Sequence, residues 1–199
     1  PRKCKESSRP PGGGRRQDAK ESHVNEQVIT LGGGCFWCLE AVYELVDGVT
    51  AVESGYCNGH VANPSYEQVC SGATGHAEVV RVTFDADRIA LHEVLEIFFN
   101  IHDPTSLNRQ GNDIGTQYRS GIYFHDAAQE AVVREVVAQA NAALKGRVVT
   151  EVAPVANYSR AEAYHQHYFA NHPQAGYCAF VVAPKVEKFR RVFKARVRA

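Results

Sequence analysis

The sequence predicts a single α+β domain, a ferredoxin-like βαββαβ two-layer sandwich with additional helices and a long irregular C-terminal segment. Three observations predict this class. The 199 residues are 44% hydrophobic and 22% charged, which suits one globular core. No run of 18 apolar residues is present, so no membrane-spanning segment is expected. Strand and helix patterns also follow one another in the order that this class requires.

The first half of the chain alternates between short strands and amphipathic helices. Apolar residues recur at helical spacing, for example at Leu39, Val42 and Val46, and at strand spacing at Val80 and Val82. In chain order, the expected elements are a strand over 28–31, a helix beginning at Cys35, a strand over 49–56, a polar loop over 59–75, a strand over 78–84 and a helix over 91–98.

The second half opens with another long polar loop. The elements expected there are a loop over 103–119, a strand over 121–125, a helix over 133–144, a strand over 148–152, a helix around 161–170, a Gly/Pro-punctuated stretch over 173–183 and a basic helix over 185–198. Two loops of about 17 residues are long for a compact domain, and such loops often carry function. We therefore expect functional side chains on both loops.

Charge is distributed unevenly along a chain whose formal net charge is zero. Residues 1–26 carry seven Lys/Arg and four acids among Pro, Gly and Ser, so we expect a disordered basic tail and a single catalytic domain over 27–199. The tail has no apolar segment, so no secretory signal peptide is expected. Residues 27–184 carry 8 Lys/Arg and 17 Asp/Glu, an acidic balance that disfavours a nucleic-acid-binding surface.

Cysteine usage indicates the kind of chemistry and the compartment. The chain has six cysteines, at positions 4, 35, 38, 57, 70 and 178. In a chain without a recognisable signal peptide, this number favours redox or metal chemistry over a structural disulfide framework. We expect a cytoplasmic monomer.

The segment Gly32-Gly-Gly-Cys-Phe-Trp-Cys38 is the most informative part of the sequence. A strand enters it, the glycines allow a tight turn, and a helix begins at Cys35, where unpaired N–H groups and the helix dipole favour negative charge. A thiol in that position can have its pKa lowered from about 8.5 to roughly 3.5–7.5, which predicts a thiolate at neutral pH. Phe36 and Trp37 would provide an apolar wall beside the sulfur.

The same turn is also compatible with other roles for its two cysteines. Cys35 could be an inert buried thiol, although such a thiol needs neither a glycine turn nor a helix start. Cys35 and Cys38 have the spacing of a zinc knuckle, but no second pair of ligands completes the site cleanly. Thioredoxin-type disulfide exchange also uses this spacing at a strand-to-helix turn and is the main enzymatic alternative. A non-enzymatic binding module controlled by the two cysteines is the alternative from another class.

The sequence resembles the peptide methionine sulfoxide reductases of type A over residues 27–183. The glycine turn matches as Gly34-Cys-Phe-Trp37. The further matching blocks are Gly55-Tyr56, Asn63-Pro-Ser-Tyr66, Thr74-Gly-His-Ala-Glu78, His102-Asp-Pro104, Gln110-Gly-Asn-Asp113, Gly115-Thr-Gln-Tyr-Arg-Ser120, Glu162-x-x-His-Gln166 and Gly176-Tyr-Cys178.

The resemblance implies an enzyme that reduces methionine S-sulfoxide, free or within proteins. Cys35 would attack the sulfoxide sulfur, methionine would leave, and a sulfenic acid would remain on Cys35. Phe36 and Trp37 would hold the methyl group of the substrate. No metal, flavin or nucleotide is implied, and the expected partner is a thioredoxin-type reductant rather than a nucleic acid or a membrane. His76 and His165 receive no catalytic role.

Four polar residues complete the implied site. Glu78 would give a proton to the sulfoxide oxygen, because that oxygen departs only as hydroxide or water. Tyr66 and Tyr118 would donate hydrogen bonds to the same oxygen, and Asp113 would order the site through water. A carboxylic acid can donate a proton near neutral pH only when burial raises its pKa, and we expect this of Glu78.

Two cysteines are candidates for condensing with the sulfenic acid. Cys178 matches the recycling cysteine of the family, and its Gly/Pro-rich surroundings favour a mobile segment. Cys38 stands where the family more commonly has glycine. Its i, i+3 placement puts its Cα about 5–6 Å from that of Cys35, within disulfide reach. Cys38 is therefore either the first resolving thiol or a bystander, and Cys178 is expected to be necessary for recycling by thioredoxin.

Overall fold

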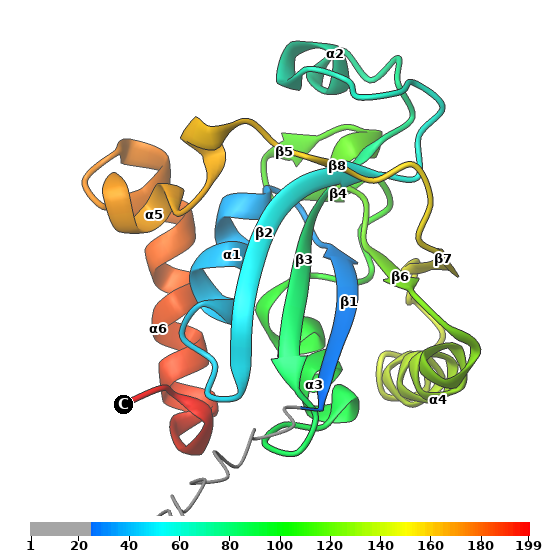
Figure 1. Ribbon diagram of the computed structural model, residues 1–199, viewed down its shortest axis with the longest axis vertical. Helices are drawn as coiled ribbons and strands as arrows, with labels where there is room; N and C mark the ends of the chain where they lie inside the picture. Colours follow the sequence, from blue (N-terminus) through cyan, green and yellow to red (C-terminus); the bar gives the residue numbers. More distant parts are fainter. Residues whose placement is uncertain (1–24) are drawn as a thin grey trace, which may run out of the picture.

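A computed structural model describes residues 25–199 (Figure 1). The fold is mixed α+β, with a central six-stranded sheet and helices packed against it. Most of the tail predicted over 1–26 lies outside the described residues, and Glu26 already belongs to the first strand. Within the described residues, no helix is long and apolar enough to cross a membrane.

Six strands form the sheet. They are β1 Glu26–Gly32, β2 Val49–Cys57, β3 Ala77–Asp85, β6 Gly121–Phe124, β7 Glu151–Pro154 and β8 Ser159–Arg160. Their spatial order is β7-β6-β1-β3-β2-β8. Every neighbouring pair is antiparallel except β6 and β7, which are parallel. The C-terminal end of β1 and the N-terminal end of β3 therefore lie side by side, at the same end of the two central strands.

Side chains on β3 alternate between the two faces of the sheet, as the period of a strand requires. Val80, Val82 and Phe84 belong to the main core, whereas Ala77 and Val79 belong to a smaller cluster on the opposite face. All five are buried. The predicted alternation is confirmed, and β3 is covered on both faces.

Four helices bury apolar side chains in the main core. They are α1 Phe36–Tyr43, α3 Leu91–Ile101, α4 Ala127–Ala143 and α6 Ala183–Val192. α6 packs along α1, and α4 connects the parallel strands β6 and β7 (Figure 1). The helix predicted over 133–144 begins earlier, because the Asp126 carboxylate accepts a hydrogen bond from the Gln129 N–H and caps α4.

The two long loops contain short elements that the sequence did not predict. The first loop holds α2, Tyr66–Cys70, which begins at a capping box between Ser65 and Gln68. The second holds the hairpin of β4, Arg109–Gln110, and β5, Asp113–Ile114, followed by a 3₁₀ turn over Thr116–Tyr118. Both loops are thus ordered around local hydrogen bonds rather than irregular.

The last part of the chain differs most from the prediction. The helix expected around 161–170 is wrong, because His167 adopts a left-handed conformation with φ 54° and leaves only a 3₁₀ turn over Ala163–His165 and the short α5, Tyr168–Asn171. The irregular backbone expected around Cys178 is also wrong. A π-helical turn, Cys178–Val182, leads directly into α6. This wide turn precedes Pro184, which has no N–H to donate to an ordinary helical turn.

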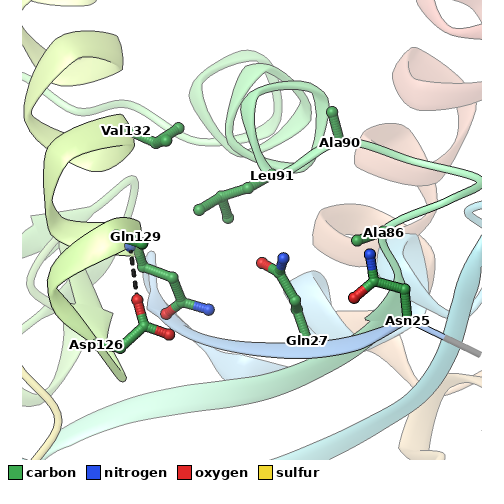
Figure 2. Close-up of a pocket in the computed structure, with 9 residues that line it drawn as sticks. Asn25, Gln27, Ala86, Ala90, Leu91, Asp126, Gln129 and Val132 are labelled. Atoms are coloured by element: carbon green, nitrogen blue, oxygen red, sulfur yellow. Dashed lines mark hydrogen bonds between the residues drawn. The ribbon is translucent and has the colours of Figure 1, made fainter.

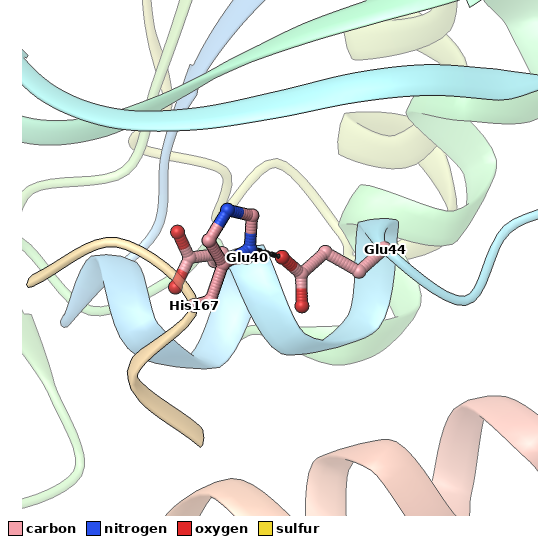
Figure 3. A group of neighbouring side chains, drawn as sticks. All are labelled: Glu40, Glu44 and His167. Atoms are coloured by element: carbon pink, nitrogen blue, oxygen red, sulfur yellow. Dashed lines mark hydrogen bonds and ion pairs between the residues drawn. The ribbon is translucent and has the colours of Figure 1, made fainter. Parts of the chain in front are cut away.

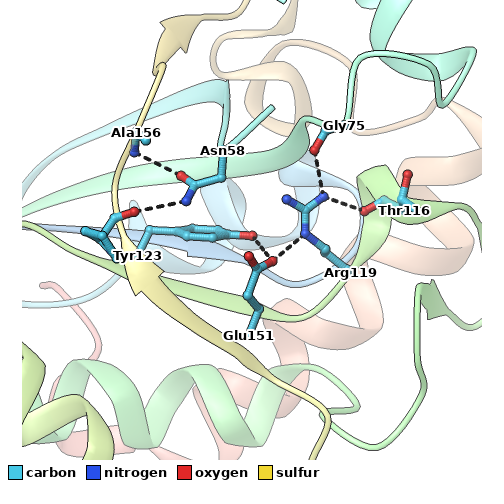
Figure 4. Close-up of polar contacts among 8 residues, drawn as sticks. Asn58, Gly75, Thr116, Arg119, Tyr123, Glu151 and Ala156 are labelled. Atoms are coloured by element: carbon cyan, nitrogen blue, oxygen red, sulfur yellow. Dashed lines mark hydrogen bonds and ion pairs between the residues drawn. The ribbon is translucent and has the colours of Figure 1, made fainter. Parts of the chain in front are cut away.

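An arginine fastens both long loops to the sheet (Figure 4). The Arg119 guanidinium donates to Glu151 on β7 at 2.6 Å and to the carbonyls of Gly75 and Thr116 at 3.2 and 3.1 Å. The Tyr123 hydroxyl donates to the same Glu151 oxygen at 3.1 Å. The Arg119 side chain is only 15% exposed, whereas Glu151 is 40% exposed, so these contacts are partly shielded from water. They connect the end of the first loop, at Gly75 just before β3, to the second loop at Thr116.

We expect Arg119→Met to lower the free energy of unfolding by about 2 kcal/mol, because it leaves two carbonyls without their donor and removes the cation beside Glu151, which keeps only the Tyr123 hydroxyl. The matched control is Arg134→Met, which removes an exposed i, i+4 ion pair with Glu130 and should cost about 0.5 kcal/mol or less. Urea denaturation measures both. Equal losses in the two variants would contradict the anchoring role of Arg119.

Candidate active site

The glycine turn brings the chain from β1 to α1 through a space without room for side chains. Gly34 has φ +89°, and a Cβ there would lie 2.7 Å from the side chain of Gln110. A Cβ on Gly33 would lie 3.1 Å from the ring of Phe98. Glycine is therefore required for both the backbone conformation and the close packing. The turn places Cys35 immediately before the first residue of α1.

The Cys35 thiol is buried, with 9% of the residue exposed. Burial raises the pKa of this thiol well above its ordinary value, and the neighbouring Glu78 and Cys38 raise it further. Hydrogen bonds from the Trp37 N–H and the Tyr177 hydroxyl act in the opposite direction. The prediction of a thiolate at neutral pH is therefore wrong for the resting site. α1 has only eight residues, and desolvation of the sulfur outweighs its dipole.

Glu78 lies near the start of β3 with 1% of its surface exposed. The Phe36 N–H donates to its Oε2 at 3.2 Å. Burial raises the pKa of the Glu78 carboxyl to about 8; the Phe36 hydrogen bond lowers it and the charge of Asp113 raises it. At neutral pH the carboxyl is mostly protonated and can donate a proton. Burial thus shifts the pKa in the predicted direction.

Aromatic side chains enclose the space beside Cys35. Phe36 is 1% exposed and lies 5.8 Å, centroid to centroid, from Tyr56. Trp37 stacks on Tyr168 at 3.7 Å and meets Tyr177 edge-on at 5.8 Å. Tyr168 and Tyr177 come from segments more than a hundred residues away in sequence. They hold the Trp37 ring in one orientation.

Tyr66 and Tyr118 approach the carboxyl from the two long loops. Tyr66 is the first residue of α2, and Tyr118 ends the 3₁₀ turn. Burial is the largest cause of the raised pKa of each hydroxyl, and the charge of Glu78 contributes to both. Both hydroxyls remain protonated at neutral pH. Both hydroxyls are within electrostatic reach of the Glu78 carboxyl.

Asp113 lies on β5, where its Oδ2 accepts a hydrogen bond from the Tyr177 hydroxyl at 2.6 Å. Both residues border a cavity of about 360 Å³. The residues that line it are Gln110, Gly111, Asn112, Asp113, Tyr177, Phe180, Val181, Pro184 and Lys185. Asp113 also raises the pKa of Glu78, so its carboxylate is close enough to influence the proton donor.

Three thiols lie along the contact between α1 and the segment before α6. The Cys38 N–H donates to the Cys35 carbonyl at 3.1 Å, one turn along the chain. Cys38 and Cys178 are both fully buried. Cys38 contributes to the raised pKa of Cys35 and also to that of Cys178, so it lies within electrostatic reach of both.

The remaining cysteines do not join this group. Cys57 is buried in the small cluster on the other face of the sheet, and Cys70 lies beside the Tyr66 hydroxyl. Cys4 lies outside the described residues.

The site also contains residues that the sequence analysis did not assign. The His165 Nδ1 accepts a hydrogen bond from the Trp37 Nε1–H at 3.2 Å, and its ring lies 4.5 Å from that of Tyr66. The position of Tyr177 beside Cys178 in a matching block could have identified it as a site residue, whereas no sequence motif identifies Tyr168. His76, by contrast, contacts the Val61 carbonyl at 2.7 Å.

Three side chains that could together bind a metal ion lie on α1, at its C-terminal end and just before α5 (Figure 3). These side chains, Glu40, Glu44 and His167, have ligand atoms within 4.8 Å of one another. Glu40 accepts hydrogen bonds from the Ser54 hydroxyl and the Tyr168 N–H at 3.2 Å each, and Glu44 pairs with His167. These contacts tie α1 to β2 and α5. Both carboxylates therefore have polar partners within the protein, and their positions need no metal ion.

A second cavity of about 370 Å³ lies at the opposite end of β1 from the glycine turn (Figure 2). The residues lining it are Asn25, Gln27, Ala86, Ala90, Leu91, Asp126, Ala128, Gln129 and Val132. Its carboxylate, Asp126, already caps α4. The cavity contains no nucleophile, so the site at the glycine turn is the candidate for catalysis.

Comparison with known proteins agrees with this site. The family model described as peptide methionine sulfoxide reductase matches residues 27–197. The "Peptide methionine sulfoxide reductase MsrA" of Saccharolobus solfataricus is 51% identical over 172 residues, covering 86% of this chain and 97% of that protein.

Solved structures are also similar. Mxr1 from Saccharomyces cerevisiae in reduced form is 37% identical with a TM-score of 0.74, covering 77% of this chain and 90% of that one. Mxr1 in complex with Trx2 is 26% identical with a TM-score of 0.53, covering 76% of this chain and 91% of that one. From its sequence and its site, the chain belongs to the peptide methionine sulfoxide reductase family.

Proposed function

We propose that the chain reduces methionine S-sulfoxide, free or in oxidised proteins, with Cys35 as the nucleophile. The observation that carries this assignment is the buried pair of Cys35 and Glu78 at the start of α1. Glu78 is within electrostatic reach of the thiol and, with a pKa of about 8, is protonated at neutral pH. A nucleophile and a proton donor are thus present in one desolvated site.

In the first step, the Cys35 sulfur attacks the sulfoxide sulfur while Glu78 protonates the oxygen. The oxygen transfers to Cys35, which becomes a sulfenic acid, and methionine leaves. Tyr66 and Tyr118 donate hydrogen bonds to the oxygen and stabilise the charge that develops on it. The hydrogen of the sulfenic acid is the proton that Glu78 gave to the oxygen. The proton that the Cys35 thiol gives up returns to the Glu78 carboxylate, so Glu78 is protonated again at the end of the step.

The rest of the site orients the substrate. Phe36 and Trp37 hold the methyl group against an apolar wall. Tyr168 and His165 support this role because they fix the plane of the Trp37 ring. Asp113 orders the polar side of the site, where it already accepts a hydrogen bond from Tyr177.

In the second step, Cys38 condenses with the sulfenic acid of Cys35, water leaves, and a disulfide forms. The Cys178 sulfur then attacks Cys38 in this disulfide, so that a disulfide between Cys38 and Cys178 forms and the Cys35 thiol is released. The electrostatic reach of Cys38 to both other thiols supports this order. An oxidised Cys35 needs such a partner because a sulfenic acid left exposed is oxidised further.

A thioredoxin-type reductant reduces the final disulfide. The solved complex of Mxr1 with Trx2 supports this partner. Phe180, two residues after Cys178, is 84% exposed and offers an apolar contact beside the relay. Cytoplasmic location and a monomeric state stay predictions from the sequence.

We also propose that the four central strands form an elaborated ferredoxin-like sandwich. The spatial order β6-β1-β3-β2, antiparallel throughout, supports this class. In chain order, helix α1 follows β1 and helix α3 follows β3, as the class requires.

Cys35→Ser should abolish methionine release, because serine oxygen cannot accept the sulfoxide oxygen as a sulfenic acid. The fold should survive, since the two side chains have nearly the same volume. The measurement is methionine release by chromatography, with circular dichroism as the control for folding. More than a few per cent of residual activity in a folded variant would remove Cys35 from the mechanism.

Glu78→Gln should slow methionine release in a single turnover about a hundredfold or more, because it removes the proton donor and keeps the shape. The wild-type rate should fall as pH rises through about 8, where the carboxyl loses its proton. The variant should lack this fall. An unchanged rate and an unchanged pH profile would show that another group donates the proton.

Cys178→Ser and Cys38→Ser should each still release about one methionine per chain in a single turnover. The Cys178 variant should accumulate the disulfide between Cys35 and Cys38 and turn over with thioredoxin at least about tenfold more slowly. The Cys38 variant should accumulate the sulfenic acid, detectable with dimedone by mass spectrometry. Full thioredoxin turnover by the Cys178 variant would show that the relay is unnecessary.

A further inference from the structure

One of the matching sequence blocks, Glu162-x-x-His-Gln166, lies close to the site, and Glu162 has no role in the proposed mechanism. The chain around Glu162 is attached to β2 on both sides. Before it, Ser159 on β8 pairs with Tyr56 on β2. After it, the Gln166 side chain accepts a hydrogen bond from the Ser54 N–H at 3.0 Å and donates one to the Ser54 carbonyl at 2.9 Å. The Glu162 backbone is therefore held against the sheet.

Each carboxylate oxygen of Glu162 accepts one hydrogen bond. The hydroxyl of the fully buried Tyr56 donates to Oε2 at 2.8 Å. The backbone N–H of Tyr66, the first residue of α2, donates to Oε1 at 2.9 Å. Burial raises the pKa of the Glu162 carboxyl, but these and other hydrogen bonds hold it below its ordinary value, so the group is ionised at neutral pH. One carboxylate thus joins β2 to α2.

α2 is too small to fix its position by apolar packing alone. The helix has five residues, of which only Val69 is buried. Its capping box determines where the helix begins along the chain, but both members belong to the same segment and do not attach α2 to the sheet. At the other end, the Gln117 amide approaches the Cys70 carbonyl at 3.5 Å, which is long for a hydrogen bond. The Glu162 contact is the shorter of these two attachments.

The Glu162 contact also relates α2 to the proton donor. In the register of β2 and β3, Tyr56 pairs with Glu78. A chain of contacts therefore runs from the strand position opposite Glu78, through the Tyr56 hydroxyl and the Glu162 carboxylate, to the backbone of Tyr66. In the proposed first step, the Tyr66 hydroxyl and the Glu78 carboxyl must reach the same substrate oxygen. The rate of that step therefore depends on how precisely the two groups are placed relative to each other.

We propose that Glu162 is a positioning residue for the first step, in which its carboxylate holds the start of α2 so that the Tyr66 hydroxyl meets the sulfoxide oxygen. This inference rests on the proposed function. A donor that is already in place stabilises a developing charge without reorganisation during the reaction. Loss of the Glu162 carboxylate should therefore slow methionine release and have little effect on substrate binding, which depends on Phe36 and Trp37.

The test measures the rate of the first methionine release at several concentrations of methionine sulfoxide, without a reductant. Glu162→Ala should lower the rate at saturating substrate at least about tenfold and change the half-saturating concentration less than about twofold. Glu162→Gln should recover most of the rate, because it keeps the length and an oxygen for the Tyr66 N–H. The control Glu67→Ala removes an exposed carboxylate from α2 itself and should match the wild type. Circular dichroism checks that each variant is folded.

A double-mutant cycle separates positioning of Tyr66 from general support of the fold. If Glu162 acts through the Tyr66 hydroxyl, adding Glu162→Ala to Tyr66→Phe should slow methionine release less than about twofold further. A further tenfold loss in the double variant would overturn the positioning role, as would a Glu162→Ala variant that changes only the half-saturating concentration. Absence of methionine release from the wild type would instead overturn the proposed function.

Discussion

The hydrogen bond from the Phe36 N–H to the buried Glu78 carboxyl is the contact on which the site depends. It joins the start of α1 to the start of β3, and it places a carboxyl beside a thiol in a space that excludes water. Desolvation then sets the chemistry of both groups, because it disfavours their charged forms. The carboxyl keeps its proton near neutral pH and the thiol is not ionised at rest.

The scaffold brings this contact about through the sheet and the glycine turn. β1 and β3 are antiparallel neighbours, and Leu31 near the end of β1 pairs with Val80 near the start of β3. Gly33 and Gly34 let the chain turn closely against Phe98 and Gln110. Arg119 then holds the two long loops, which carry Tyr66 and Tyr118, against the same end of the sheet. The π-helical turn before α6 packs against α1 and contributes Cys178.

The features that could be predicted from the sequence are those that depend on the spacing of residues within one element. The strand alternation on β3, the helix start at Cys35 and the cysteines near the turn all follow from residue spacing. The sequence did not predict the ordered turn at Cys178, since Gly and Pro were interpreted as breaks although they only flank a helix. It overestimated the helix dipole at Cys35, because burial depends on distant segments. Tyr168 contributes through its stacking on Trp37, which lies on an element far away in the chain, and no local sequence pattern indicates that contact.

The central claim is that burial keeps the Glu78 carboxyl protonated at neutral pH. The most direct measurement is a carbon-13 NMR titration of glutamate carboxyl groups in the reduced protein, with Glu78→Gln to assign the resonance. The account predicts a carboxyl that titrates with a pKa near 8 and disappears in the variant. A Glu78 resonance that titrates near the ordinary glutamate value of about 4.3 would contradict it.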